Sequence, residues 1–382
     1  MTSFTLTPEV LRHPDSYKWT LYPQEVLPLW VADMDFAPAP SIVAALKDRL
    51  EHGLGYHLLR GDPDLTRLLG ARLEQQGVPP LPEGGMRFLP GVVPGLYAAV
   101  LGLTAPGDDV LSFTPIYPPF LSAIRDHGRT ARTVPLLQGE LGWDIDWAAL
   151  EQAVTPATRL LMLCHPHNPT GRVWTREELA GLAAFALRHR LWVVSDELHA
   201  DLSFQGPHTP FVTISPELEQ RTLTVTGPCK AYNTAGLGIG AMYSHNLALL
   251  DRVTQASAGV MGHPSAMSVT MWRAALQDDG AWLAAVLDQL RQNRDRVTAW
   301  AATVPLLRYS PPEATYLAWL DLTRHPRAAD MQAFLLSEAK VALNDGPPFG
   351  DGYQGFVRLN FATSPEILEE ALTRIGRALA QE

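Results

Sequence analysis

The chain has 382 residues, of which 46% are hydrophobic and 18% are charged, with a formal net charge of −10. A chain of this length exceeds what one hydrophobic core usually supports, so we expect a large domain and a smaller one. The acidic balance argues against nucleic acid or an anionic membrane as the main partner.

Two further features indicate a cytoplasmic protein. Cys164 and Cys229 are the two cysteines, too few for a disulfide framework, which favours a reducing compartment. Residues 1–10 lack the basic start and apolar core of a signal peptide, and no apolar run approaches the roughly 20 residues that span a bilayer.

The first forty residues read as an irregular arm that packs on the body, because they are too apolar to be disordered. Ser41 is the expected N-cap of a helix that stops at Gly53. We predict an N-terminal arm with part of a small domain over 1–45, a large domain over 46–282 and a C-terminal small domain over 283–382.

From Met86 onward, apolar runs alternate with helical segments. The predicted strands are 86–89, 109–113, 132–136, 159–164, 191–195 and 222–225, and helices are expected near 146–154 and 175–189. Continuous apolar runs interleaved with helices are typical of an α/β fold with a mostly parallel sheet buried on both faces. Strands at 315–321 and 355–361, with helices at 331–338 and 365–379, indicate an α+β C-terminal domain.

Polar residues follow three of these strands, at the carboxyl edge where open α/β sheets bind ligands. Lys230 comes after one apolar run; its ordinary role would be a surface charge, but small apolar neighbours also suit a lysine that forms a Schiff base. Asp196 would ordinarily cap the next helix; alternatively it keeps a pyridine nitrogen protonated, as pyridoxal phosphate requires. His199 would then lie near the ring hydroxyl of that cofactor.

The order Asn168-Pro-Thr-Gly171, Asp196, Lys230 and a late Arg358 resembles the fold-type I pyridoxal phosphate enzymes of the aminotransferase class I/II family, over almost the whole chain. The resemblance implies the aspartate aminotransferase-like fold, with a sheet of the seven-stranded type. It also implies roles: Asn168 binds the ring hydroxyl, Asp196 pairs with the pyridine nitrogen, and Lys230 holds the cofactor covalently. Arg358 would bind the substrate carboxylate, a task that suits a guanidinium.

A narrower resemblance, to the MalY/PatB-like branch of cystathionine β-lyases, is carried by further motifs: Asp15-Ser-Tyr-Lys-Trp19, Trp30-Val-Ala-Asp-Met-Asp-Phe36, Pro90-Gly-Val-Val-Pro-Gly95, Thr114-Pro-Ile-Tyr117, Asp196-Glu-Leu-His-Ala-Asp201 and Thr315-Tyr-Leu-Ala-Trp-Leu-Asp321. It implies that Tyr117 stacks on the pyridine ring and that the amides of Val92 and Val93 hold the phosphate at a helix start. It also implies that Tyr56 reaches the phosphate of a neighbouring subunit, so that a homodimer shares its active sites. Trp30, Asp33 and Tyr316 would contact the substrate.

The chain departs from this pattern in two places. His165 stands where the branch usually has asparagine, and Cys229 stands where it usually has serine before the lysine. A thiol donates more weakly to phosphate than a hydroxyl does, and Thr226 is expected to supply part of that contact.

The predicted function is α,β-elimination of cystathionine or another cysteine S-conjugate to pyruvate, ammonia and a thiol. Two alternatives stay open: transamination by the same residues, and a catalytically silent cofactor-binding regulator. The remaining histidines show no metal-ligand spacing, so we expect no metal site.

Overall fold

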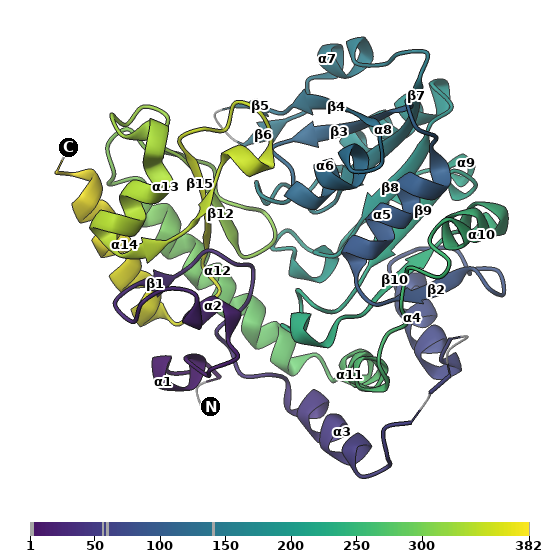
Figure 1. Ribbon diagram of the computed structural model, residues 1–382, viewed down its shortest axis with the longest axis horizontal. Coiled ribbons are helices and arrows are strands. Elements are labelled where there is room, and N and C mark those ends of the chain that lie inside the picture. Colours follow the sequence, from purple (N-terminus) through teal and green to yellow (C-terminus); the bar gives the residue numbers. More distant parts are fainter. Residues whose placement is uncertain (1–3, 56, 59–60, 140–141, 382) are drawn as a thin grey trace.

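The structure is a computed structural model that describes residues 4–55, 57–58, 61–139 and 142–381. Its centre is a seven-stranded sheet in the order β2-β10-β9-β8-β7-β3-β4 (Figure 1). The strands in chain order are β2 (Met86–Leu89), β3 (Asp109–Thr114), β4 (Thr130–Pro135), β7 (Thr158–Cys164), β8 (Trp192–Asp196), β9 (Thr222–Thr226) and β10 (Gly240–Tyr243). Only β10 among them runs antiparallel to its neighbours. The predicted mostly parallel sheet is confirmed.

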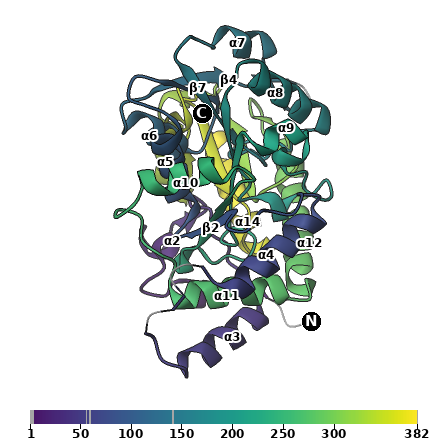
Figure 2. The same cartoon turned by 90° about the vertical axis from the view of Figure 1, so that its right-hand side faces the viewer.

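Helices cover both faces of this sheet (Figure 2). One face packs against α5 (Val92–Leu103), α6 (Pro118–Arg125) and α10 (Leu247–Ala256). The other packs against α7 (Trp147–Gln152) and α8 (Arg176–Arg188), beside α9 (Pro216–Glu219) and the short hairpin of β5 (Leu137–Gln138) and β6 (Trp143–Asp144). Because both faces are covered, the inner strands are buried along almost their whole length, which explains their largely apolar sequences.

A second, antiparallel sheet has the order β11-β12-β15-β14. Its strands are β11 (Arg308–Tyr309), β12 (Leu317–Asp321), β15 (Phe356–Asn360) and β14 (Asn344–Asp345), and its helices are α12 (Ala281–Ala301), α13 (Met331–Phe334) and α14 (Pro365–Leu379). The helix predicted over 331–338 is shorter than expected, because a π-helical turn (Leu335–Ala339) replaces its second half. The division of the chain at 45/46 and 282/283 stays a prediction.

The N-terminal arm lies beside this second sheet (Figure 1). It contains α1 (Pro8–Leu11), α2 (Tyr17–Thr20) and β1 (Leu27–Pro28), and β1 pairs in parallel with β13 (Val341–Ala342). Next come α3 (Pro40–Leu50) and α4 (Pro63–Gln75); both contact α11 (Ala266–Gln277).

The expected N-cap at Ser41 is wrong. The helix begins one residue earlier, at Pro40, with Ala39 as its cap and no side-chain hydrogen bond there. Proline suits the first helical position because its missing N–H would have no partner in that turn. Ser41 donates instead to Asp278, at the end of α11. Among the described residues, no helix is both long enough and apolar enough to cross a membrane.

Candidate active site

Three parallel neighbours, β7, β8 and β9, deliver the first polar residues to one edge of the large sheet. Strand β8 ends at Asp196, β9 is followed by the turn that carries Lys230, and β7 leads into the turn that carries Asn168. The second sheet contributes Arg358 from β15, whose guanidinium donates to the Asn168 Oδ1 at 3.1 Å. Side chains far apart in sequence therefore meet at the carboxyl ends of these strands.

Lys230 is half-buried and bonded to the N-terminal arm. Its Nζ donates to the carbonyl oxygen of Ala32 at 2.9 Å, and the hydroxyl of Tyr316 donates to the same oxygen at 3.0 Å. Two of the predicted site residues thus share one acceptor in the arm.

The Asp196 carboxylate is buried and accepts one hydrogen bond, from the amide of Leu198 at 3.0 Å. Burial raises its pKa to about 7. A carboxylate held this way gains from any cationic or N–H partner brought to it, because such a partner restores what desolvation removes.

His199 lies near the same charges. Burial is the main reason that its pKa falls to about 3, with Lys230 and Arg358 adding to the effect. The imidazole is therefore neutral at neutral pH, and its Nδ1 is buried with no hydrogen-bond partner among the residues that the structure describes. Such an orphaned ring nitrogen is expensive to bury in an apolar interior, so it is available to a bound group.

Arg358 is buried yet paired with neutral partners. It donates to Asn344 Oδ1 at 2.5 Å and to the Trp30 carbonyl at 3.4 Å, while its Nε is buried without a partner. No carboxylate among the described residues forms an ion pair with it. Burial lowers its pKa to about 10, so the guanidinium remains charged at neutral pH. A buried, charged guanidinium that has no carboxylate partner among the described residues is suited to bind a carboxylate ligand.

The start of α5 forms a backbone cradle. Val92 and Val93 occupy its first turn, and three glycines approach closely. A Cβ on Gly240 would lie 3.1 Å from the Val92 amide nitrogen, and one on Gly238 would lie 2.5 Å from the carbonyl oxygen of Pro90. The free amides of a helix N-terminus attract anions, so this crowded turn could hold a phosphate through its backbone.

Three other predicted cofactor contacts border the site. Tyr117 precedes α6 and has its pKa raised by burial, with Arg358, Asp196 and Cys229 close enough to influence it. The thiol of Cys229 is half-buried, and burial raises its pKa as well. The Thr226 hydroxyl donates at 3.4 Å to the carbonyl of Glu197, so here it has a protein partner. Tyr56 lies outside the described residues.

Two predicted substrate contacts come from the arm. The Trp30 indole donates to the Lys18 carbonyl at 3.3 Å and packs edge-on against Tyr17 and Tyr22. The pKa of Asp33 is raised by burial, although the charges of Lys18 and Lys230 oppose that shift.

His165, one of the two departures, belongs to a buried polar cluster. Its Nε2 is 3.1 Å from the carbonyl of Thr209, and its ring centroid is 4.5 Å from that of His208. His208 in turn contacts Glu197 at 2.9 Å, and Ser195 donates to the same carboxylate. His165 therefore has protein partners of its own, and burial together with His208 holds its pKa well below the usual range.

Sequence reasoning missed several asparagines around the site. Asn344 accepts from Arg358, Asn233 bonds both backbone groups of Met34, and Asn360 bonds two carbonyls of the arm. Asn233 lies three residues after Lys230 and Asn360 two residues after Arg358, so a close look at amides near these site residues could have found them. No motif or residue spacing in the sequence pointed to Asn344. Among the described residues, no group of three His, Cys, Asp or Glu side chains could hold a metal ion.

The large sheet with helices on both faces defines an α/β protein, and the amides at the start of α5 and the buried Arg358 guanidinium are groups suited to an anionic small molecule. The sequence profile described as aminotransferase class I and II matches residues 24–375. The chain belongs to this family.

Individual relatives and solved structures indicate which branch of the family the chain is similar to. The chain is 36% identical to cystathionine beta-lyase PatB of Bacillus subtilis (93% of each chain covered). It is 32% identical to protein MalY of Escherichia coli, over 93% of this chain and 92% of MalY. The crystal structure of cystalysin from Treponema denticola, which contains a pyridoxal 5'-phosphate cofactor, matches with a TM-score of 0.93 and 29% identity over the whole of both chains. The predicted resemblance to the MalY/PatB-like branch is confirmed.

Proposed function

We propose that this protein is a pyridoxal phosphate-dependent carbon–sulfur β-lyase that converts cystathionine or a related cysteine S-conjugate to pyruvate, ammonia and a thiol. Full-length similarity to PatB supports the reaction, and similarity to cystalysin supports the cofactor. The observation that carries the proposal is the buried Arg358, which forms no ion pair with a carboxylate of the described residues and bonds to Asn168 in the same site as Lys230 and His199.

The residues present fit the cofactor. The α5 start, with Val92 and Val93, would hold its phosphate by backbone amides. The buried Asp196 carboxylate would hold the protonated ring nitrogen, and Asn168 and His199 would face the ring hydroxyl. Tyr117 would stack on the ring. Pyridoxal phosphate supplies an electron sink for the pair left when a bond to Cα breaks.

Different protein side chains would bind the substrate and move its proton. Arg358 binds the α-carboxylate of the amino acid, since its guanidinium is charged and lacks an anionic partner. Lys230 would hold the cofactor covalently, and its amine, when free, would take the proton from Cα of the substrate. The thiolate then leaves from Cβ. Trp30, Asp33 and Tyr316 line the substrate side of this arrangement, with the Ala32 carbonyl holding the lysine amine.

The proposal extends to assembly and location. A homodimer in which Tyr56 completes the neighbouring site is proposed from the branch resemblance. The small proportion of cysteine supports a cytoplasmic location.

Pyruvate release tests the reaction. The purified holoenzyme is incubated with L-cystathionine and no added keto acid, and pyruvate is measured by a coupled assay. We expect pyruvate from the wild type, a loss of at least ~10³-fold in Lys230→Ala, and no change in the surface control Lys47→Ala. Transfer of the amino group to an added keto acid, without pyruvate, would instead establish the aminotransferase alternative. A wild type that shows a visible cofactor band but neither activity would instead support the catalytically silent, cofactor-binding regulator.

A further inference from the structure

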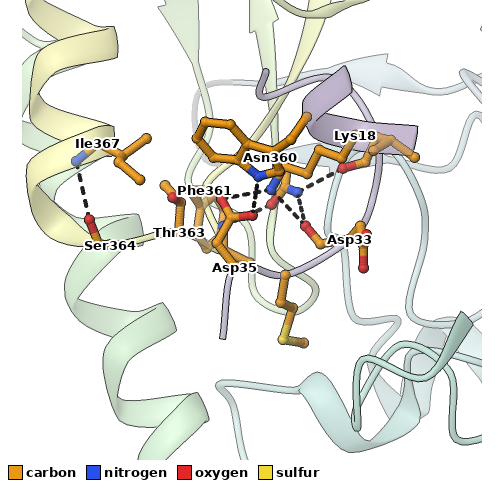
Figure 3. Close-up of polar contacts among 12 residues, drawn as sticks. Lys18, Asp33, Asp35, Asn360, Phe361, Thr363, Ser364 and Ile367 are labelled. Carbon is orange, nitrogen blue, oxygen red and sulfur yellow. Dashed lines mark hydrogen bonds and ion pairs between the residues drawn. The ribbon is translucent and has the colours of Figure 1, made fainter. Parts of the chain in front are cut away.

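The segment from Trp30 to Phe36 passes across the candidate site and is held from several sides. The carbonyl of Ala32 accepts hydrogen bonds from Lys230 and Tyr316, so the position of this short segment decides where the lysine amine rests. Other residues that hold the segment lie outside the site. They belong to a polar network on the side of α2 and β15 (Figure 3).

Lys18 and Asp35 are the charged centre of that network. Both side chains are 1% exposed, and the Lys18 Nζ lies 2.9 Å from an Asp35 carboxylate oxygen. The same Nζ donates to the Asp33 carbonyl at 2.9 Å, and the other oxygen of Asp35 accepts from the Trp19 indole at 2.8 Å. Helix α2 thus binds the segment at the Asp33 carbonyl and at the Asp35 carboxylate.

A buried ion pair contributes little net stability, because desolvating two charges offsets much of their attraction, whereas it does demand one geometry. That makes the pair better suited to fixing a position than to strengthening the fold. Figure 3 shows the Asp33 carboxylate directed away from the network, while its backbone carbonyl is drawn into it. The network therefore orients the backbone of the segment.

Two asparagines complete the constraint on either side of Ala32. Asn360 Nδ2 donates to the carbonyls of Val31 and Asp33, at 2.7 and 2.6 Å. Asn233, three residues after Lys230, accepts from the Met34 amide and donates to its carbonyl, both at 2.8 Å. Carbonyls immediately before and after Ala32 are thus fixed, and the Ala32 carbonyl is left to the site.

We propose that Lys18 and Asp35 are positioning residues for Lys230, acting through the segment Trp30–Phe36 to set the Ala32 carbonyl that accepts from the lysine amine when that amine is not bound to the cofactor. The proposal rests on the catalytic role proposed for Lys230. Because coupling between two parts of a protein is reciprocal, loss of the Lys230 contact must also loosen the segment.

The test uses a paired neutral replacement, Lys18→Met with Asp35→Asn, which leaves an acceptor for Trp19 and no unpaired buried charge. The matched control is Arg308→Met with Asp321→Asn, an ion pair of the second sheet with one buried carboxylate. Hydrogen exchange of peptides covering 27–36 and 226–234 is measured on each holoenzyme, together with kcat and KM per bound cofactor for L-cystathionine.

We expect exchange in both peptides to rise at least threefold in the Lys18/Asp35 variant and not in the control. We expect kcat per bound cofactor to fall at least tenfold and by a larger factor than KM rises, since the segment carries the Ala32 carbonyl as well as the substrate-side residues Trp30 and Asp33. A general loss of folding would lower the cofactor content instead. Exchange in 27–36 should also rise in Lys230→Ala.

Unchanged exchange at 226–234 in the Lys18/Asp35 variant, or a kcat within twofold of the control, overturns the proposal. If that variant is insoluble, Asn233→Gly replaces it: glycine accepts the φ of 52° found there and removes both bonds to Met34. Wild-type exchange and kcat in Asn233→Gly overturn the proposal equally. A wild type without lyase activity refutes the proposed reaction, while the exchange measurements still decide the coupling.

Discussion

Replacing Arg358 with lysine keeps the positive charge and removes the planar fork. In the structure the guanidinium donates to Asn168, Asn344 and the Trp30 carbonyl at once, which a single ammonium at a different reach cannot reproduce. A hydrogen bond to a charged group contributes about 1.5–3 kcal/mol. Losing one or two of them in the transition state raises the barrier by about 3 kcal/mol, which is roughly a 150-fold loss in kcat/KM.

The assay is pyruvate release from L-cystathionine under kcat/KM conditions, with cofactor content measured for each preparation. Arg308→Lys is the matched control, because this arginine also lies on a strand of the second sheet but is 43% exposed. We expect the control to stay within twofold of the wild type. Arg358→Lys retaining a third or more of the wild-type kcat/KM would refute the assignment of Arg358 to the substrate carboxylate.

Three more predictions follow from single contacts. In the cofactor-free chain, the pKa of Asp196 is about 7 in the folded state and about 3.9 in the unfolded state. The folded state therefore binds the proton more tightly, which stabilises the fold fully below pH ~4. This stabilisation is lost as the pH rises to 7. Urea unfolding should show up to about 4 kcal/mol of this decline in the wild type and none in Asp196→Asn; equal slopes would contradict it. Gly171→Ala places a Cβ 2.2 Å from the Cβ of Pro312, at a residue whose φ is 72°. Thermal unfolding should show that the free energy of unfolding falls by about 2–4 kcal/mol. The control Gly70→Ala has open space around the new Cβ and should not lower the free energy of unfolding. Cys229→Ser supplies a stronger donor near the α5 cradle, so the Kd for pyridoxal phosphate should fall roughly fivefold (about 1 kcal/mol) by absorbance titration; an unchanged Kd would show that residue 229 does not bond the phosphate.

The large sheet could be predicted from sequence because its inner strands are buried on both faces and are therefore largely apolar. The polar residues that end those strands were found for the same reason, since parallel strands present them at a single edge. Lys230 alone would have passed for a surface charge; the order of Asn168, Asp196 and Arg358 around it carried the prediction.

What sequence reasoning could not supply was the arm. Residues 15–36 have neither helical nor strand periodicity, and their partners are side-chain amides and backbone carbonyls from distant parts of the chain. No sequence pattern pairs Asp35 with Lys18, and only the folded structure reveals their ion pair. Non-local hydrogen bonds to irregular backbone leave no periodic trace in a sequence, so neither Asn233 nor Asn344 was foreseen.

The arm also determines how late in synthesis the substrate side of the site can form. Its binding sites lie late in the sequence: Leu27 pairs with Val341, and the amide of Asp35 donates to the carbonyl of Ala362. At ~5–20 residues per second, a ribosome needs tens of seconds to make the roughly 300 residues between them. The first residues to emerge must therefore wait for the last strand, and the substrate side of the site closes only when the chain is almost finished.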